Sequence, residues 1–503
     1  MINPTLETAM HLAKNYKVIP VCKEIYSDFT TPIQVLRRLK KVSGHCYMLE
    51  SVENQKRWGR YTFLGYMPKL CVTCINGNIK ITDVNGSVVT EEKTSHPRDY
   101  INKILAEYKS PKIEGMPSFT GGLVGYFAYD YIKYSEPKLN NETYDSEGFN
   151  DVDLMLFDKV IAFDNEKQKM IIIVNAKTDN ISENYARALE EIDGIIELVR
   201  NGKEEKVESP KLKSEFRSLF DKEQFCSMVN SAKKYIYEGD IFQVVLSNRL
   251  EADFEGSLLD TYRVLRTINP SPYMFYFSGD EIEVAGASPE TLVKLEDGVL
   301  HTFPLAGTRP RGTTAKEDKD FERGLLTDEK ECAEHNMLVD LGRNDLGRIS
   351  KFGSVKVEKY MSVERYSHVM HIGSTVRGEI RDDKCALDAV DAVLPAGTLS
   401  GAPKIRACEI ISELENNKRG IYGGAVGYID FTGNLATCIA IRIAYKKNGK
   451  VFVRSGAGIV ADSIPENEFQ ECINKAKAVV TAIEASQDMN KDEEGNGNDI
   501  TDR

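Results

Sequence analysis

Two Asn-Gly pairs constrain the fold of this chain more than any other feature of its sequence. They occur at 76–77 and 85–86 in the run LCVTCINGNIKITDVNGSVVTEE, between stretches in which apolar and polar residues alternate. Alternation with a period of two predicts half-buried strands, and Asn-Gly suits a two-residue hairpin because both turn positions need a positive φ. The run therefore predicts a meander of antiparallel strands.

Strands and helices are mixed along the rest of the chain. DLMLFDKVIAF (153–163) and KMIIIVN (169–175) flank a polar turn and predict a second antiparallel pair. Apolar periodicity predicts helices at 180–200, 221–238, 317–340, 384–393, 403–416 and 465–485. Helices mixed with strands that tight hairpins connect predict an α+β (mixed α/β) fold rather than a parallel doubly wound sheet.

The stretch NGKEEKVESPKLKSE (201–215) is polar and charged and contains a proline, which is typical of a linker. We therefore predict an N-terminal domain over 1–205 and a second domain over 216–485. The last residues, 486–503, are polar and contain few apolar side chains, so they are predicted to form a disordered tail.

Charge and composition exclude several classes of partner. The net charge of −12 argues against nucleic acid, which needs a basic surface. No apolar run approaches the about 18 residues of a membrane helix, and the N-terminus lacks the apolar core of a signal peptide. The ten cysteines are mostly single and lie among apolar residues, as reduced thiols do. We expect a cytoplasmic protein with no membrane partner.

Two predicted helices each carry a pair of glutamates three residues apart. Glu331 and Glu334 lie in DEKECAEH, and Glu468 and Glu471 lie in PENEFQECINK. Residues at this spacing share one face of a helix. One interpretation is that each pair simply faces solvent. The other is that the helices meet around a cation, because four converging carboxylates would otherwise repel one another, and hard oxygen ligands favour Mg²⁺.

Three loops combine glycine with small polar residues: FPLAGTRPRG (303–312), LPAGTLSGAPK (394–404) and VRSGAGIVADS (453–463). Such loops are mostly ordinary turns, but glycine also lets backbone N–H groups approach an anion closely. The spacing of a nucleotide-binding P-loop is absent, so we expect any bound anion to be a carboxylate rather than a nucleotide phosphate.

Two basic features remain open on the sequence alone. The histidines of HVMH (368–371) lie in a predicted strand, HVMHIGSTVRGEI, so their side chains would face opposite ways and at most one would enter a site. Arg442 lies among apolar residues in the predicted strand TCIAIRIAYKK, where a guanidinium needs an anionic partner. That partner is either a ligand or a structural carboxylate.

Six segments occur in one order: FPLAGTRPRG, DEKECAEHNMLVDLGRND, HVMHIGSTVRGEI, LPAGTLSGAPK, RGIYGGAVGYID and SGAGIVADSIPENEFQE. Together they resemble the chorismate-utilising enzymes, most closely component I, the large subunit, of anthranilate synthases. The resemblance covers roughly residues 25–480. It implies a large antiparallel-sheet sandwich flanked by helices. It also implies an N-terminal domain that contributes a tryptophan regulatory site and a chorismate-binding catalytic domain.

The resemblance implies a lyase reaction in which ammonia adds to chorismate, the 4-hydroxyl group leaves and pyruvate is eliminated to give anthranilate, the first step of tryptophan biosynthesis. Glu334 and Glu471 would hold Mg²⁺, while Glu331 and Glu468 would bind its waters. Glu331 would also be the general acid, and His371 would serve the second step. The substrate side of the site would comprise Thr398, Gly307, Thr308, Tyr422, Arg442 and the backbone of Gly456, Ala457 and Gly458.

Two positions distinguish related enzymes. Aminodeoxychorismate synthases commonly have a nucleophilic lysine where this chain has Ala306, and isochorismate and salicylate synthases have a water-activating lysine where it has Gln243. Alanine cannot form a covalent intermediate and glutamine is a poor base, which favours external ammonia as the nucleophile.

The resemblance also implies feedback inhibition by tryptophan. Ser51, Pro272, Tyr273 and Met274 would contact the inhibitor, with Glu50, Val426 and Tyr428 as further candidates. No Gly-x-Cys-x-Gly elbow of a glutaminase occurs, so ammonia would come from a separate glutamine amidotransferase subunit (component II), in a heterotetramer, or from free ammonia. Three alternatives remain: component I of aminodeoxychorismate synthase, a zinc hydrolase using HVMH and the glutamates, and a non-catalytic tryptophan-binding regulatory protein.

Overall fold

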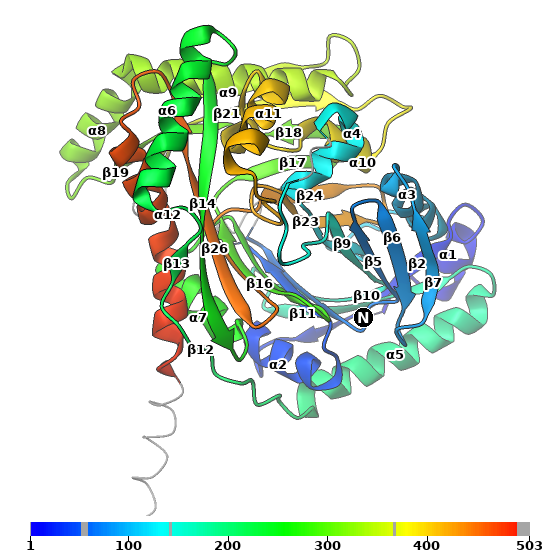
Figure 1. Cartoon of the computed structure of the whole chain (residues 1–503). Coiled ribbons are helices and arrows are strands. Elements are labelled where there is room, and N and C mark those ends of the chain that lie inside the picture. The colour runs from blue at the N-terminus through cyan, green and yellow to red at the C-terminus, as the bar shows by residue number, and fades with distance from the viewer. Residues whose placement is uncertain (1, 52–58, 140–142, 366–368, 490–503) are drawn as a thin grey trace, which may run out of the picture.

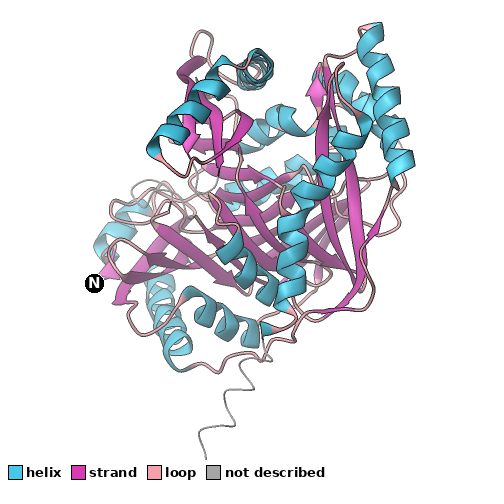
Figure 2. Cartoon of the chain, turned by 90° about the vertical axis from the view of Figure 1, so that its left-hand side faces the viewer, coloured by secondary structure: helices cyan, strands magenta, loops and turns pink. Residues whose placement is uncertain are grey.

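The computed structural model describes residues 2–51, 59–139, 143–365 and 369–489. Within these residues two large antiparallel sheets pack against each other, and helices lie against them on the outside (Figure 1; Figure 2). The interior between the sheets is apolar and aromatic: Tyr47, Phe63 and Ile171 come from one sheet, and Tyr126 and Met155 from the other. The α+β fold with a sandwich of antiparallel sheets is therefore confirmed.

The larger sheet has fourteen strands. Its order is β1 (Ile2–Asn3), β2 (Val18–Tyr26), β11 (Lys169–Lys177), β10 (Lys159–Asp164), β4 (Tyr61–Tyr66), β3 (Cys46–Glu50), β15 (Tyr273–Ser278), β16 (Glu283–Ser288), β25 (Ile443–Lys447), β26 (Lys450–Ile459), β14 (Gln243–Glu255) and β12 (Lys211–Leu212). β13 (Arg217–Ser218) and β22 (Gly401–Ala402) also pair with β14.

The second sheet has twelve strands. Its order is β19 (Leu305–Pro310), β21 (Val369–Glu379), β18 (Val299–Thr302), β17 (Thr291–Glu296), β24 (Leu435–Ile439), β23 (Ala425–Asp430), β8 (Gly122–Phe127), β9 (Val152–Phe157), β5 (Leu70–Ile75), β6 (Asn78–Asp83) and β7 (Val88–Lys93), and β20 (Lys356–Arg365) pairs with β21. β5, β6 and β7 form the predicted meander, and its first turn has positive φ at Asn76 (48°) and Gly77 (80°).

Helices cover both sheets. They are α1 (Leu6–Leu12), α2 (Pro32–Val42), α3 (Pro97–Glu107), α4 (Ile132–Ser135), α5 (Ile181–Asn201), α6 (Lys222–Glu238), α7 (Leu259–Ile268), α8 (Ala315–Thr327), α9 (Glu329–Gly347), α10 (Ala386–Val393), α11 (Lys404–Glu415) and α12 (Pro465–Ser486). α2, α5, α7 and α12 pack on the larger sheet, and α3, α9 and α10 pack on the second. None of the described helices is long and apolar enough to cross a membrane.

Both parts of the chain contribute to both sheets. β3 pairs with β15, and β8 pairs with β23, so strands from either side of the predicted linker lie next to each other. The linker itself has neither helix nor strand from 202 to 210. The division into 1–205 and 216–485 stays a prediction. Of the predicted tail, residues 490–503 lie outside the described part of the chain.

The predicted helix 317–340 and the predicted strand 153–163 are each divided in the structure. The predicted helix 317–340 is α8 followed by α9, because Asp328 caps a new helix with hydrogen bonds from the N–H groups of Lys330 and Glu331. The predicted strand 153–163 is β9 followed by β10, which belong to different sheets. The run is apolar almost throughout because the chain passes at Asp158 from one buried strand to another.

Candidate active site

The first turn of α9 holds Glu331 beside β19. Arg309 on β19 pairs with the carboxylate of Asp328 at 2.9 Å and with Oε1 of Glu331 at 3.2 Å. Gly307 lies against the same glutamate, since a Cβ there would come within 3.0 Å of Glu331 Oε2. Gly307 has a φ of +64°, which glycine adopts without strain. The glycine loop and the acidic helix, separate in the sequence, thus meet.

Glu334 lies one helical turn beyond Glu331, at a more buried position. Burial, and then the negative charge of Glu331, raise the pKa of Glu334. Gln243, at the start of β14, donates from Nε2 to Glu334 Oε1 at 3.5 Å. The structure therefore brings together the first predicted glutamate pair and the glutamine that replaces a water-activating lysine.

The second glutamate pair lies at the start of α12. Glu471 Oε1 is 2.6 Å from Nζ of Lys475, which also donates to the carbonyl oxygen of Gly456 at 3.0 Å. Burial raises the pKa of Glu468, and although a hydrogen bond from Ser463 opposes this, the charge of Glu471 adds to it. In each pair, the charge of one carboxylate therefore raises the pKa of the other.

α9 and α12 face each other across a gap that contains the Lys475 ammonium group. Burial raises the pKa of Glu334 and Glu468, and the positive charges of Lys330, on α9, and Lys475, on α12, oppose that rise at both carboxyls. Each helix thus places a lysine within electrostatic reach of the other helix's glutamate. That the two glutamate pairs meet around a cation stays a prediction.

The donor chemistry of the gap fits a hard divalent cation. Four carboxylates supply only oxygen ligands, and the Lys475 ammonium beside Glu471 marks a place where positive charge is favoured. In the described part of the chain, however, no three His, Cys, Asp or Glu side chains are gathered closely enough to hold a metal. A cation would therefore have to draw the glutamates together and replace the ammonium group.

His371 lies on β21 and faces β19. Its Nδ1 is 2.8 Å from the carbonyl oxygen of Gly307 and 3.2 Å from Oγ1 of Thr308. A carbonyl only accepts hydrogen bonds, so the ring proton lies on Nδ1 and Nε2 is the basic nitrogen. Burial lowers the pKa of His371, which makes the neutral ring the main form at pH 7. His368, the other histidine of HVMH, lies outside the described residues.

Glu290 belongs to this site, although it was missed in the sequence analysis. It follows β16 in the run GASPE and accepts a hydrogen bond from Oγ1 of Thr398 at 3.1 Å. Burial raises the pKa of Glu290 to about 7. Glu290 and Thr398 line a cavity of about 40 Å³. An acidic residue directly after a fully buried strand was the signal that could have identified it.

Tyr422 and Arg442 stay predicted substrate-binding residues, but Arg442 is not in a strand. It forms the bend between β24 and β25, with a φ of 55°, and its Nη1 donates to the carbonyl oxygen of Lys475 at 2.9 Å. Burial lowers the pKa of Arg442, and no described carboxylate forms an ion pair with it. Burial raises the pKa of Tyr422, so its hydroxyl stays a donor. A half-buried guanidinium without a carboxylate ion pair among the described residues suits an anionic ligand.

The strand of Gly456, Ala457 and Gly458 has two backbone N–H groups that point away from β14. The opposite residues of Gly456 and Gly458 on β14 are Ser247 and Val245, whose N–H groups bond instead to Glu415 and to the Ser400 carbonyl. Gly456 and Gly458 are therefore not hydrogen-bonded to β14, and the Gly456 carbonyl indeed meets Lys475. The backbone N–H of Ala457 points to β14. Unlike those of Gly456 and Gly458, it is therefore not available for the predicted contact with substrate.

The four predicted tryptophan-binding residues come together at the end of β3. Glu50 is opposite Met274 in the sheet, so Ser51 follows directly beside Pro272, Tyr273 and Met274. The hydroxyl of Ser51 is buried and has no hydrogen-bond partner among the described residues. Residues 52–58, which continue this segment, lie outside the described part of the chain.

Comparison with known proteins gives consistent matches. The family model of the chorismate binding enzymes matches residues 44–481. The anthranilate synthase component 1 of Acetivibrio thermocellus is 47% identical over 497 residues, which span 97% of this chain and 100% of that protein. That of Aquifex aeolicus is 45% identical over 500 residues, spanning 98% and 100%.

Solved structures agree with the sequence matches. Anthranilate synthase component I from Streptococcus pneumoniae has a TM-score of 0.75 at 38% identity, over 90% of this chain and 98% of that chain. The menaquinone-specific isochorismate synthase of Escherichia coli has a TM-score of 0.66 at 19% identity, over 95% and 99%, and so shares the fold.

Proposed function

This chain belongs to the chorismate binding enzymes, among the component 1 proteins of anthranilate synthases, and we propose that it converts chorismate and ammonia to anthranilate and pyruvate. The observation that carries the proposal is the gap between α9 and α12, where Glu334, Glu468 and Glu471 lie within electrostatic reach of Lys475. Chorismate carries two carboxylates, and the site offers Arg442 and two backbone N–H groups for them.

The cofactor we propose is Mg²⁺. Glu334 and Glu471 would hold it directly, and Glu331 and Glu468 would hold it through water. When bound, it would neutralise the ring carboxylate of chorismate and withdraw electron density from the ring. The proposal is supported by the donor type of these residues and by the pKa of Glu334 and Glu468, which burial and the neighbouring carboxylate raise in the absence of such a cation.

In the first step ammonia adds at C2 of the ring, the ring double bonds shift and the C4–O bond breaks. The departing hydroxyl needs a proton to leave as water. Glu331 is one candidate donor. Glu290 is the better one by its acidity, because a carboxyl with a pKa of about 7 still carries a proton near neutral pH. Thr398 holds the Glu290 carboxyl in place through its hydrogen bond.

In the second step a base removes the C2 proton, the C2–C3 double bond forms and enolpyruvate leaves from C3. Enolpyruvate then takes up a proton and becomes pyruvate. His371 suits the role of the base, because burial keeps its ring neutral and the Gly307 carbonyl holds the proton on Nδ1, which leaves Nε2 to accept one.

Three further properties belong to the proposal. Ammonia would come from a glutamine amidotransferase subunit in a heterotetramer, which the name component 1 of the relatives supports. Tryptophan would inhibit by binding at Ser51 and Pro272–Met274, which the unpartnered hydroxyl of Ser51 supports. The enzyme would work in the cytoplasm, where its ten free cysteines would stay reduced.

Product analysis tests the proposal. Purified protein with chorismate, Mg²⁺ and ammonium should form fluorescent anthranilate and an equal amount of pyruvate. Formation of 4-amino-4-deoxychorismate without pyruvate would instead identify an aminodeoxychorismate synthase. Tight stoichiometric zinc with hydrolytic turnover would identify a hydrolase. No turnover, together with tryptophan binding, would identify a regulatory protein.

A further inference from the structure

The segment from Asn417 to Gly424 carries Tyr422 into the substrate side of the site and is anchored by two consecutive buried cations. Lys418 and Arg419 expose 4% and 1% of their surface. Buried cations persist only where they are paired and hydrogen-bonded. The partners of Lys418 and of Arg419 lie in different parts of the chain, so the two side chains connect this segment to two separate clusters.

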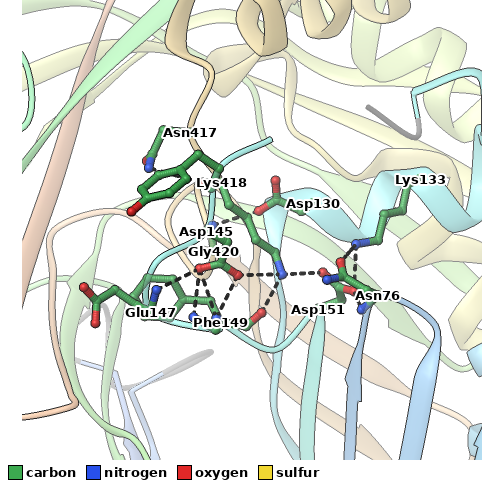
Figure 3. A network of polar contacts seen from close by, with 12 residues as sticks. Asn76, Asp130, Lys133, Asp145, Glu147, Phe149, Asp151, Asn417, Lys418 and Gly420 are labelled. Atoms are coloured by element: carbon green, nitrogen blue, oxygen red, sulfur yellow. Dashed lines mark hydrogen bonds and ion pairs between the residues drawn. The ribbon is translucent and has the colours of Figure 1, made fainter. Parts of the chain in front are cut away.

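The contacts of the Lys418 ammonium group come from residues 145–151, in the N-terminal part of the chain. Its Nζ donates to the carbonyl oxygen of Phe149 at 2.6 Å and pairs with Oδ1 of Asp151 at 3.0 Å and Oδ2 of Asp145 at 3.3 Å (Figure 3). Burial lowers the pKa of Lys418, but the nearby aspartates raise it overall. The ammonium group therefore stays charged and completes a cage of oxygen atoms.

The cage is itself fixed to the second sheet. Asp151 Oδ2 accepts hydrogen bonds from the N–H of Asn76 at 2.7 Å and from the hydroxyl of Tyr134 at 2.7 Å, and pairs with Lys133 at 2.8 Å. Figure 3 shows Asn76, Lys133 and Asp151 on one side of Lys418 and Gly420 close to it. A second aspartate, Asp130, accepts the N–H of Gly420 at 2.8 Å. The N-terminal part thus binds the Tyr422 segment at Lys418 and at Gly420, and backbone hydrogen bonds with Tyr129 and Tyr144 add to these contacts.

Arg419 points to the catalytic side. It donates to the carbonyl oxygens of Leu399 and Val245, both at 2.7 Å, and pairs with Glu415. Leu399 follows Thr398, the partner of Glu290, and Val245 lies opposite Gly458. The backbone step from Lys418 to Arg419 therefore connects the oxygen cage to two parts of the substrate site.

We propose that Lys418 is a positioning residue for the active site: by binding Phe149, Asp145 and Asp151 it holds the Tyr422 segment in place, so the N-terminal part of the chain helps to form the substrate site. Lys418 itself contacts none of the residues assigned to chorismate, and it acts through Tyr422 and Arg419. The proposal rests on the proposed function, because it takes the Tyr422 side of the gap as the chorismate site.

The test compares Lys418→Met with Lys447→Met in the full-length protein. Lys447 is a matched control: it is also a buried lysine, 6% exposed, and it binds the same loop through the carbonyl oxygen of Gly148 at 2.8 Å. It ends β25, however, and its side-chain hydrogen bonds go to Gly148 and Glu281, outside the Tyr422 segment. Both variants remove a cation from the 145–149 loop, and only one removes the connection to Tyr422.

With ammonium as the nitrogen source, Lys418→Met should raise the KM for chorismate about tenfold or more, because small displacements of substrate-binding groups are costly. Its kcat should change much less, and Lys447→Met should keep both constants within about twofold. Equal KM values for the two lysine variants would overturn the proposal.

Hydrogen exchange without substrate gives a readout that does not depend on the proposed reaction. The amides of Gly420, Gly423 and Gly424 are hydrogen-bonded to Asp130, Ala440 and Ile421. Lys418→Met should speed their exchange, while Lys447→Met should not. Unchanged exchange in Lys418→Met would contradict the positioning role even if the protein proved inactive. If the wild type lacked anthranilate activity but Lys418→Met still exchanged faster than the wild type, only the proposed function would be contradicted.

A double variant covers the case in which Lys418→Met alone fails to fold. Lys418→Met removes the cation that Asp145 and Asp151 share and leaves the two carboxylates with Lys133, so Lys418→Met/Asp151→Asn, which removes one of the two negative charges, should fold better than the single variant. In the double variant the Tyr422 segment still lacks the contacts of the Lys418 ammonium group. The raised KM for chorismate and the fast amide exchange should therefore persist. Recovery of wild-type KM together with the melting temperature would show that Lys418 matters for stability alone.

Discussion

Nζ of Lys475 lies 2.6 Å from Oε1 of Glu471, one helical turn away on α12, and so occupies the acidic gap into which a divalent cation would have to enter. Two cations do not share such a space at low cost, because like charges repel and each needs the same oxygen ligands. Replacing Lys475 by methionine should therefore tighten Mg²⁺ binding.

We expect Lys475→Met to lower the dissociation constant of Mg²⁺ about tenfold, equivalent to about 1.4 kcal/mol of electrostatic free energy. Isothermal titration of the protein with Mg²⁺, without chorismate, measures this directly. Lys477→Met, on the same helix but at an exposed position, is the control and should leave the constant unchanged. Weaker binding in Lys475→Met would mean that the lysine supports the cation rather than competing with it.

Glu334→Gln and Glu471→Gln should each abolish Mg²⁺ binding and lower kcat by about 10²-fold or more, since each removes a charged ligand of the proposed cation. The substitutions keep the size of the side chain, so circular dichroism and melting should resemble those of the wild type. Glu466→Gln, in the exposed first turn of α12, is the matched control. Wild-type turnover in Glu334→Gln or Glu471→Gln would remove the metal assignment.

Most of the elements could be predicted because their sequences repeat with the period of their own structure. The meander around Asn76 and Gly77 and the helices α5, α6, α11 and α12 agree with the predictions to within a few residues. The predictions that were wrong involve positions where contacts between distant parts of the chain determine where an element begins or ends. Asp328 begins a new helix partly because Arg309, from a distant strand, pairs with it, and no local pattern shows that partner.

The residues of the candidate site likewise divide into those that a local sequence pattern reveals and those that only tertiary contacts reveal. Both glutamate pairs were visible from their spacing of three, but Glu290 has no such companion and becomes recognisable only when burial and Thr398 are known. Arg442 was assigned to a strand because its neighbours are apolar. In the structure it lies in a bend with positive φ, where the carbonyl oxygen of Lys475, a residue of α12, accepts its hydrogen bond. Long-range partners of this kind leave no periodic signal in a sequence.

Ser51→Phe should relieve tryptophan inhibition and leave the reaction intact. The Ser51 hydroxyl is buried beside Pro272, Tyr273 and Met274, so a phenyl group there would fill the space that a ligand needs. We expect the inhibitory concentration of tryptophan to rise about tenfold or more, with kcat and the KM for chorismate within about twofold of wild type. Inhibition at the wild-type concentration would exclude this pocket.

The pH dependence of the reaction should report Glu290. Its pKa of about 7 lies well above the ordinary 4.5 because the carboxyl is buried, so the acid form is available near neutral pH and is lost above it. If Glu290 donates the proton to the leaving hydroxyl, kcat/KM should fall about tenfold per pH unit above roughly pH 7. Glu290→Gln should lose this alkaline limb and about 10²-fold or more of the rate, whereas Glu331→Gln should keep the limb.

Stability gives an independent check of the same pKa, without substrate. A carboxyl whose folded-state pKa of about 7 exceeds its ordinary value of 4.5 binds its proton more tightly in the folded protein. Its contribution to the free energy of unfolding is therefore complete below the ordinary value and is lost as the pH rises through the folded value. The wild type should lose stability relative to Glu290→Gln between about pH 5 and about pH 8 in denaturant titrations. A constant difference across that range would show that Glu290 titrates normally and would remove it as the proton donor.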